Sequence, residues 1–461
     1  MNRASEADWE RLAKTVTGRV LRPGDAGFRA SSAPFNTRFA SVTPAGVLSV
    51  ADHADVAHAL AWARDTGTGL VARSGGHSYA GHSVNTGLVI DLRALDTVSA
   101  DGSTGLVTAA GGARTADVYA ALQPHEMAFA LGNGASVGLA GLTLGGGSAA
   151  TSRTLGLTAD ALVSTTLMTA DGQVLTCDDR QNPDLYWACR GGGGGNFGIN
   201  LSFTFQARPV ADVSTCLLLW DGAHAPAALA AFAAVQEAAR HAPDAFSVRL
   251  GVSTAAGRDP VVSAVGLHLG PENELRELLA PVLAAAPPAR ADIAARTFWQ
   301  AKDYLLHETS AGAFAARTNF AAAPLPDEAV AAVLARLADW PGSGNPDGCG
   351  LALYTWGGAI NRVAPDATAF VHRDARFLVS MDTSWAEHDT PAGVEAGLRW
   401  LAGLREALAP YVGQGAYQNF IDPDLPDWRT AYYGANYPRL VEIKKRVDPD
   451  RVFTFGQAIG S

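Results

Sequence analysis

The sequence predicts an α+β protein with more than one domain, and three observations lead to that prediction. The chain has 461 residues, 48% of them hydrophobic and 17% charged, which is enough to bury about two to three domain-sized cores. Its first part alternates short apolar strands with amphipathic helices. Its middle part alternates strands with alanine-rich helices of high intrinsic helix propensity.

The first part reads as an α/β unit followed by a hairpin. The elements predicted there are a helix at 6–20, a strand at 47–51, a helix at 54–67, a strand through Leu70, strands at 88–92 and 106–110, a helix at 113–125, and two strands joined by an Asp-Gly turn within 163–176.

The middle part predicts an antiparallel sheet with helices on one face, because that is the simplest way to cover such strands. The strands are predicted within 214–222, 246–257, 261–270, 350–360 and 375–385, and the helices within 223–243, 273–286 and 327–340.

Composition and charge point to a small-molecule ligand. The net charge is −10 and the pI is about 5.5, and without a basic run neither nucleic acid nor an anionic membrane is an expected partner. The N-terminus has no apolar signal-peptide core and no apolar run reaches the ~20 residues of a membrane span, so a cytoplasmic location is predicted. The four cysteines form no CxxC pair and HExxH is absent, so no metal site is predicted.

Three glycine-dense stretches stand out, at 71–91, 131–160 and 190–199. In the first, Gly75 and Gly76 permit a tight turn that presents His77. Main chain without side chains suits contact between backbone N–H groups and an anionic or extended ligand. Neither the GxxxxGK[ST] nor the GxGxxG phosphate motif is present.

Residues 134–138 satisfy GxSxG, the nucleophile motif of α/β-hydrolases, with Ser136 as its serine. That motif needs a strand before it and a helix after it. The segment that follows is rich in glycine, and each glycine costs a helix ~1 kcal/mol relative to alanine. We therefore expect no helix there and treat a serine hydrolase as a remote alternative.

A set of ordered motifs resembles the berberine bridge enzyme-like flavoprotein oxidases of the vanillyl-alcohol oxidase group. The motifs are RSGGHS (73–78), ASVGLAGLTLGGG (135–147), DALVSTTLMTADGQVLT (160–176), NPDLYWACRGGGGGNFGI (182–199), and the C-terminal YQNFIDP and YYGANYPRLVEIKKRVDPDRVFTFGQAI. The resemblance spans nearly the whole chain. It implies a two-lobed PCMH-type FAD-binding domain over 1–207, an inserted substrate-binding domain over 208–410, and a C-terminal segment over 411–461 that returns to the FAD domain.

The resemblance also implies the cofactor and its attachment. FAD is expected to be bonded through its 8α-methyl to His77, which would make the flavin a stronger oxidant. Many relatives add a cysteinyl bond, but Gly134 stands at that position, so a single attachment is expected. Val137 matches the residue type of the family's oxidases, which implies O2 as acceptor and H2O2 as product.

The residues expected to bind the cofactor come from all of these motifs. They are Arg73, Ser74, Gly75, Gly76, His77, Ser78, His82, Ser83, Ser136, Val137, Gly138, Gly141, Leu142, Gly145, Gly146, Ala149, Asp160, Gly198, Ile199, Tyr417 and Asn419. Asp160 has an equally good alternative role as a cap for its own segment.

The catalytic base is not where the family places it. Phe420 replaces the second tyrosine of the family's YxNY motif, and Asn361-Arg362 stands where plant members have an acidic residue. Either Tyr417, Tyr354, Tyr79 or His82 is the base, or the substrate needs none. Tyr417, Tyr354 and Asn361 are the predicted catalytic residues. The candidate substrate-side residues are Tyr354, Trp356, Asn361, Arg362, His372 and Trp385, although strand aromatics are more often packing residues.

The predicted function is oxidation of a small or medium alcohol, amine or specialised metabolite by a monomer or homodimer. Two alternatives stay open: a carbohydrate oxidase of the same family, and a flavoprotein without oxidase chemistry.

Overall fold

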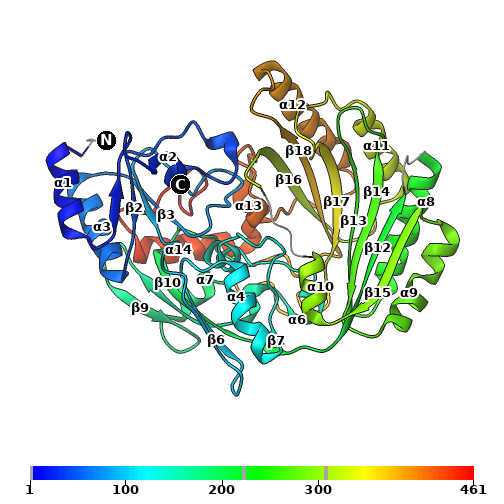
Figure 1. The fold of residues 1–461 in the computed structure, drawn as a ribbon, viewed down its shortest axis with the longest axis horizontal. Helices are drawn as coiled ribbons and strands as arrows, with labels where there is room; N and C mark the ends of the chain where they lie inside the picture. The colour runs from blue at the N-terminus through cyan, green and yellow to red at the C-terminus, as the bar shows by residue number, and fades with distance from the viewer. Residues whose placement is uncertain (1–3, 221–224, 306–309) are drawn as a thin grey trace.

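The computed structural model describes residues 4–220, 225–305 and 310–461. Two lobes lie side by side (Figure 1): one carries both chain termini, and the other is a large sheet with helices on its outer face. The predicted α+β class is confirmed.

A four-stranded sheet begins the first lobe. Its order is β1-β2-β4-β3, with β2, β3 and β4 parallel and β1 antiparallel at the edge. The elements are α1 (Glu6–Thr15), β1 (Arg19–Leu21), α2 (Phe28–Ser32), β2 (Gly46–Ser49), α3 (His53–Thr66), β3 (Leu70–Arg73) and β4 (Leu88–Asp91). The helix predicted at 6–20 is too long, because residues 19–21 pair with β2 instead.

Local signals fix the boundaries of α3. The Asp52 side chain accepts a hydrogen bond from the Asp55 N–H at 3.0 Å, which satisfies one of the free donors at a helix start. Gly67 follows the last turn with φ +66°, the left-handed conformation that suits glycine. The helix predicted at 54–67 is confirmed to within one residue.

A five-stranded antiparallel sheet completes the first lobe, in the order β5-β6-β10-β8-β9. Its strands are β5 (Val98–Asp101), β6 (Leu106–Ala110), β8 (Leu162–Met168), β9 (Val174–Cys177) and β10 (Ile199–Gln206), and nearby lie α4 (Thr115–Leu122), β7 (Met127–Ala128), α5 (Leu139–Leu144), α6 (Ser152–Leu155) and α7 (Pro183–Ala188). The hairpin predicted within 163–176 is confirmed as β8–β9.

The second lobe is a seven-stranded antiparallel sheet in the order β15-β12-β14-β13-β17-β18-β16. Its strands are β12 (Val213–Trp220), β13 (Phe246–Thr254), β14 (Val261–His268), β15 (Arg290–Arg296), β16 (Ala313–Ala321), β17 (Cys349–Thr355) and β18 (Phe377–Trp385), and its helices are α8 (Ala225–His241), α9 (Glu272–Ala285), α10 (Phe298–Leu305), α11 (Asp327–Ala338) and α12 (Pro391–Leu408). The predicted strands and helices are confirmed, while β15 and β16 were not predicted. The start of the helix predicted at 223–243 lies outside the described residues.

The two faces of this sheet have different neighbours. Helices α8, α9, α11 and α12 cover one face (Figure 1), where alternate strand residues such as Leu250 and Leu353 are almost fully buried in the core. Arg249 and Tyr354 alternate with them and therefore face the first lobe. The uncovered face thus supplies one wall of the space between the lobes.

The C-terminal segment packs back on the first lobe. It contains α13 (Trp428–Tyr433) and α14 (Tyr437–Val447). The buried Lys444 ammonium donates to the Asn196 carbonyl and to Asp448, each at 2.6 Å, and the Ile459 N–H donates to the Asn196 side chain at 2.8 Å. None of the described helices is long and apolar enough to cross a bilayer.

Candidate active site

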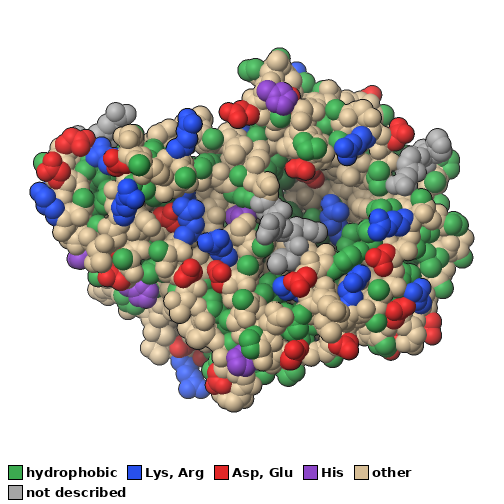
Figure 2. Space-filling model, viewed as in Figure 1, with side chains coloured by type: hydrophobic (Ala, Val, Ile, Leu, Met, Phe, Trp, Pro, Cys, Tyr) green, Lys and Arg blue, Asp and Glu red, His purple; other side chains and the backbone are tan. Residues whose placement is uncertain are grey.

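A cavity of about 1000 Å³ lies between the lobes, and Figure 2 shows the surface hollowed there. Segments far apart in sequence line it. They are the loop after β3, residues 132–152, residues 193–200, the uncovered face of β12, β13, β14 and β17, and residues 417–421 and 453–457. All three glycine-dense stretches therefore meet in one place.

The loop after β3 presents an unused row of backbone donors. Among the described residues, no N–H group from Ser74 to Ala80 donates a hydrogen bond. Arg73 holds the loop in this shape, because its buried guanidinium donates to the carbonyl oxygens of Ser31, Ser32 and Ser83. Successive free N–H groups on a turn form a concave anion-binding surface.

Close approach of two loops explains two of the glycines. A Cβ on Gly75 would lie 2.3 Å from the Gly138 nitrogen, and one on Gly138 would lie 2.2 Å from the Gly75 nitrogen. The first two glycine-dense stretches can therefore touch only without side chains at these positions.

His77 is held as a neutral imidazole within the segment that forms the donor row. Its ring stacks on Phe35 at 3.9 Å between centroids, and its Nε2 lies 3.0 Å from the Ser136 hydroxyl. Burial lowers the pKa of His77 to about 4, against a smaller opposing effect of Ser136. Ser136 occupies one ring nitrogen, and Nδ1 has no hydrogen-bond partner among the described residues.

The expectation that no helix follows GxSxG is wrong. Helix α5 forms over Leu139–Leu144 with Gly141 inside it, because buried Leu139 and Leu144 anchor it in the core. A Cβ on Gly141 would meet nothing within 4 Å, and the residue lines the cavity. The glycine that weakens the helix thus leaves bare backbone at the cavity wall.

The C-terminal segment contributes a hydrogen-bonded tyrosine. The Tyr417 hydroxyl accepts from the Gly147 N–H and from the Asn419 amide, each at 3.1 Å. Burial raises the pKa of Tyr417, and these hydrogen bonds act in the opposite direction. A phenol held by two donors in a buried position is rigidly placed.

The sheet wall places a phenol next to a cation. Arg249 and Tyr354 are cross-strand neighbours on β13 and β17, with the guanidinium carbon 5.8 Å from the Tyr354 ring centroid. The charge and hydrogen bond of Tyr354 raise the pKa of Arg249, whereas burial lowers it. Arg249 makes no ion pair with any described residue.

Tyr79 and Tyr354 pack against Phe420, the residue that replaces the second tyrosine of the family's YxNY motif. Phe420 stacks face to face on Tyr79 at 5.1 Å and meets the Tyr354 ring edge-on at 6.3 Å. Burial raises the pKa of Tyr79, and the neighbouring Tyr354 and Asp382 raise it further. Burial also lowers the pKa of His82 to about 4.

Most of the predicted site residues line the cavity, and the others lie beside it. Those lining it are Arg73, Ser74, Gly75, Gly76, His77, Ser78, His82, Ser83, Val137, Gly138, Gly141, Leu142, Ala149, Gly198, Ile199, Tyr354, Trp356, Tyr417 and Asn419. Ser136, Gly145, Gly146 and Asp160 do not line it. A Cβ on Gly145 would collide with the Asn419 side chain, so Gly145 allows Asn419 to approach.

The remaining substrate-side candidates lie away from the cavity. The Asn361 amide donates to the Ala375 carbonyl at 2.8 Å, and Arg362 pairs with Asp244. His372 stacks on Phe320 at 4.2 Å. Trp385 ends β18 and packs on the helix-covered core.

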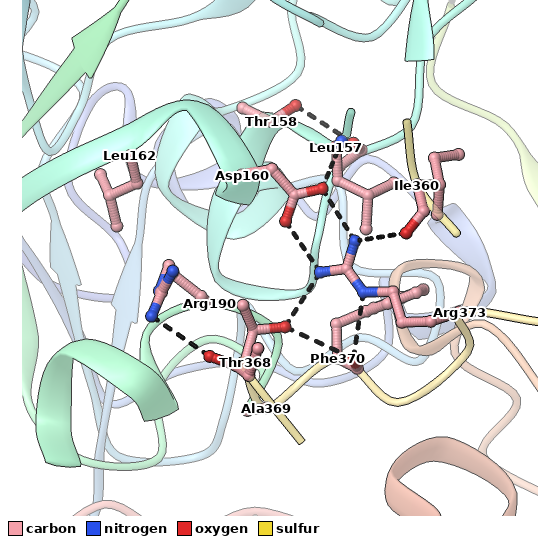
Figure 3. A network of polar contacts seen from close by, with 12 residues as sticks. Leu157, Thr158, Asp160, Leu162, Arg190, Ile360, Thr368, Ala369, Phe370 and Arg373 are labelled. Carbon is pink, nitrogen blue, oxygen red and sulfur yellow. Dashed lines mark hydrogen bonds and ion pairs between the residues drawn. The ribbon is translucent and has the colours of Figure 1, made fainter. Parts of the chain in front are cut away.

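Asp160 is committed to a structural network (Figure 3). It forms two 2.8 Å contacts with the fully buried Arg373 and accepts from the Leu157 N–H at 2.9 Å. Arg373 also donates to Thr368 at 2.9 Å. This arrangement matches the capping alternative for Asp160.

Several cavity residues carry no recognisable sequence signal. Phe35 comes from an irregular arm, and Arg249 and Tyr304 lie in ordinary strand and helix patterns. Gly193, by contrast, belongs to the glycine-dense stretch 190–199, which the sequence alone singled out as a candidate ligand-binding segment.

The cavity fits FAD by its chemistry. The side-chain atoms Ser74 Oγ, His82 Nε2 and Gln418 Oε1 are buried without a hydrogen-bond partner at its wall. Such groups cost free energy unless a ligand satisfies them. The donor row from Ser74 to Ala80 suits the pyrophosphate, and the bare main chain at Gly141 suits close contact with an extended cofactor.

Comparison with known proteins agrees with this chemistry. Residues 44–178 match the family described as "FAD binding domain", and residues 416–460 match "Berberine and berberine like". The Bacillus subtilis protein named "Uncharacterized FAD-linked oxidoreductase YgaK" is 33% identical over 96% of this chain and 97% of its own. The chain belongs to the berberine bridge enzyme-like FAD-linked oxidoreductases.

Other berberine bridge enzyme-like proteins extend the comparison. Reticuline oxidase from Eschscholzia californica is 28% identical, over 84% of this chain and 78% of its own. The structure of Physcomitrella patens BBE-like 1 is 27% identical, with a TM-score of 0.88 over 98% of both chains. This berberine bridge enzyme-like chain is therefore an FAD-linked oxidoreductase with the fold of its family.

The stability of this berberine bridge enzyme-like protein is expected to fall on acidification. Burial lowers the pKa of His82 and His372 to about 4 each, below the ~6.5 of an unfolded chain. At acidic pH the unfolded state therefore binds protons that the folded state does not bind. The stabilisation is complete above pH 6.5 and is lost as the pH falls towards 4, by about 2 kcal/mol per histidine at pH 5.

Denaturant unfolding at pH 8 and pH 5 measures this loss, and His372→Asn is expected to reduce the difference. His372 is the best choice because it lies outside the cavity. Asp382 and Asp422 act with the opposite sign, because burial raises the pKa of both carboxyls, that of Asp382 to about 6, so the comparison of the variant with the wild type is the decisive measurement. Equal pH dependence in the variant and the wild type would contradict the assignment.

Proposed function

We propose that this protein is an FAD-dependent oxidase whose flavin is bonded to His77 alone and which forms H2O2 from O2. The observation that supports it best is the placement of His77: a neutral imidazole with one free nitrogen lies beside an unused row of backbone donors. A neutral imidazole is the form that can make a new bond through nitrogen.

The glycine at residue 134, which has no thiol, supports a single attachment. A Cβ on Gly134 would lie 2.7 Å from the Val137 Cγ2 atom, so a cysteine there would require Val137 to move. Val137 itself lines the cavity. The packing around Gly134 therefore supports a flavin with one covalent bond and with the Val137 side chain nearby.

When bound, FAD accepts a hydride from a substrate C–H bond and passes the electrons to O2. The protein must take the proton from the adjacent heteroatom, and Tyr354 is the best-placed base. A guanidinium stabilises a phenolate, the form of tyrosine that accepts a proton, and only Tyr354 of the candidate phenols neighbours one. Burial works against ionisation of Tyr79 and makes His82 a weak base.

The substrate side favours a small or medium organic molecule with an aromatic or aliphatic body. Tyr79, Tyr354, Trp356 and Phe420 contribute rings to the cavity, together with aliphatic residues of β12 and β14. Arg249 is the charged side chain on the sheet wall of the cavity. Alcohols and specialised metabolites with a hydroxyl group fit this lining, because Tyr354 could take the hydroxyl proton.

His77→Ala tests the attachment. Acid-precipitated wild-type protein is expected to keep its yellow colour, and the variant is expected to release its flavin. Ser136→Ala is the matched control, because it removes the partner of Nε2 and leaves the imidazole. H2O2 formed in proportion to O2 consumed, in a screen of alcohols and amines, tests the oxidase assignment. A colourless wild-type pellet would refute the covalent bond, and reduction of FAD without peroxide would refute the oxidase.

A further inference from the structure

A second cavity of about 510 Å³ lies behind the wall of the first. Thr355 and Trp356 line both cavities, so the two cavities share part of one wall. The other residues around the second cavity are Arg153, Ala239, Arg240, His241, Ala322, Ala323, Pro324, Arg376 and Phe377. Its polar lining is therefore dominated by basic side chains.

Arg153 and Arg376 bring two guanidinium groups from different lobes to this cavity. Arg153, on α6, is 6% exposed and donates to the Phe246 carbonyl at 2.6 Å, yet its Nε atom is buried without an acceptor. Arg376 is exposed and makes no ion pair with a described residue. Burial lowers the pKa of Arg153, Asp244 raises it, and the nearby Arg376 lowers it again.

The nearby carboxylates do not fully neutralise the positive charges of Arg153 and Arg376. Glu237 forms ion pairs with Arg240 at 2.7 Å and with His241 at 2.9 Å. Arg240 and His241 lie in the last turn of α8, where basic residues are favoured by the helix dipole. Asp244 lies 3.8 Å from Arg153 but also pairs with Arg362. No carboxylate of the described residues lines the cavity, in a chain whose net charge is −10.

We propose that this cavity binds a phosphate group, either as inorganic phosphate or as part of a small phosphate ester. Guanidinium groups match the geometry of phosphate oxygens and bind them through charge-assisted hydrogen bonds. An anion here would relieve the repulsion between Arg153 and Arg376. It would also lie against Trp356, whose other neighbours include the Tyr417 ring of the active site at 6.0 Å.

Isothermal titration of the FAD-loaded protein with inorganic phosphate, glycerol phosphate and acetate at constant ionic strength tests the proposal. Arg376→Gln is the informative variant, because Arg376 is exposed and its loss does not disturb the core. Arg399→Gln is the matched control, because it removes an exposed arginine of α12 that pairs with Glu395.

Saturable binding of a phosphate compound to the wild type and Arg399→Gln, weakened about tenfold or more in Arg376→Gln, is the expected result. Tighter binding of glycerol phosphate than of inorganic phosphate would identify an ester as the ligand, and the reverse would identify the free anion. No binding at millimolar concentration, binding equal in all three proteins, or equal binding of acetate would overturn the proposal.

Discussion

Tyr354→Phe is expected to lower kcat/KM by about 10²- to 10⁴-fold, the usual contribution of a general base. The variant removes one hydroxyl next to Arg249 and leaves the ring that packs against Phe420. Flavin content and the flavin spectrum should stay as in the wild type, because no contact of the donor row involves this phenol. Anaerobic stopped-flow reduction by a substrate from the peroxide screen measures the step directly.

Tyr79→Phe is the control for this experiment, because its phenol stacks on the same Phe420 ring without a cation beside it. We expect less than about a tenfold change. Arg249→Gln should also slow reduction, because the proposed base loses the cation beside it. A larger loss in Tyr79→Phe than in Tyr354→Phe would contradict the assignment and identify Tyr79 as the base.

Sequence reasoning predicted the turn that presents His77 because the determinants of that turn are local. The turn at Gly75 and Gly76 and the histidine that follows it are neighbours in the chain, so turn chemistry alone predicts their arrangement. The three glycine-dense stretches could be assigned to one site only through the family resemblance. The contact between the first two stretches depends on the mutual approach of Gly75 and Gly138, which no local pattern encodes.

The sequence could not predict which side chains face the cavity from the inserted sheet. Arg249 looks like any polar residue of an alternating strand, and its importance arises from the β13–β17 register that places it beside Tyr354. Asn361 follows the two glycines after β17, as the motif suggests, but its amide turns to the Ala375 carbonyl. The stacking of Phe35 on His77 joins an irregular arm to the turn across 42 positions and has no sequence signature.

Arg373→Gln is expected to destabilise the protein by about 3–5 kcal/mol, the cost of leaving a buried charge without its partner. The variant leaves the Asp160 carboxylate, whose side chain is 11% exposed, facing a neutral group. Unfolding in guanidinium chloride measures the loss. Arg399→Gln breaks an exposed ion pair instead and should change the stability by less than about 1 kcal/mol.

Adding Asp160→Asn to Arg373→Gln should recover most of the lost stability, because the uncompensated charge is gone and the amide oxygen can still cap the Leu157 N–H. The same pair of variants decides between the two roles of Asp160. A residue that acts only in this network changes the free energy of unfolding and leaves the flavin spectrum of the folded protein unchanged. If Asp160→Asn alone shifted that spectrum while the stability stayed constant, Asp160 would be a cofactor contact and the structural account of it would fail.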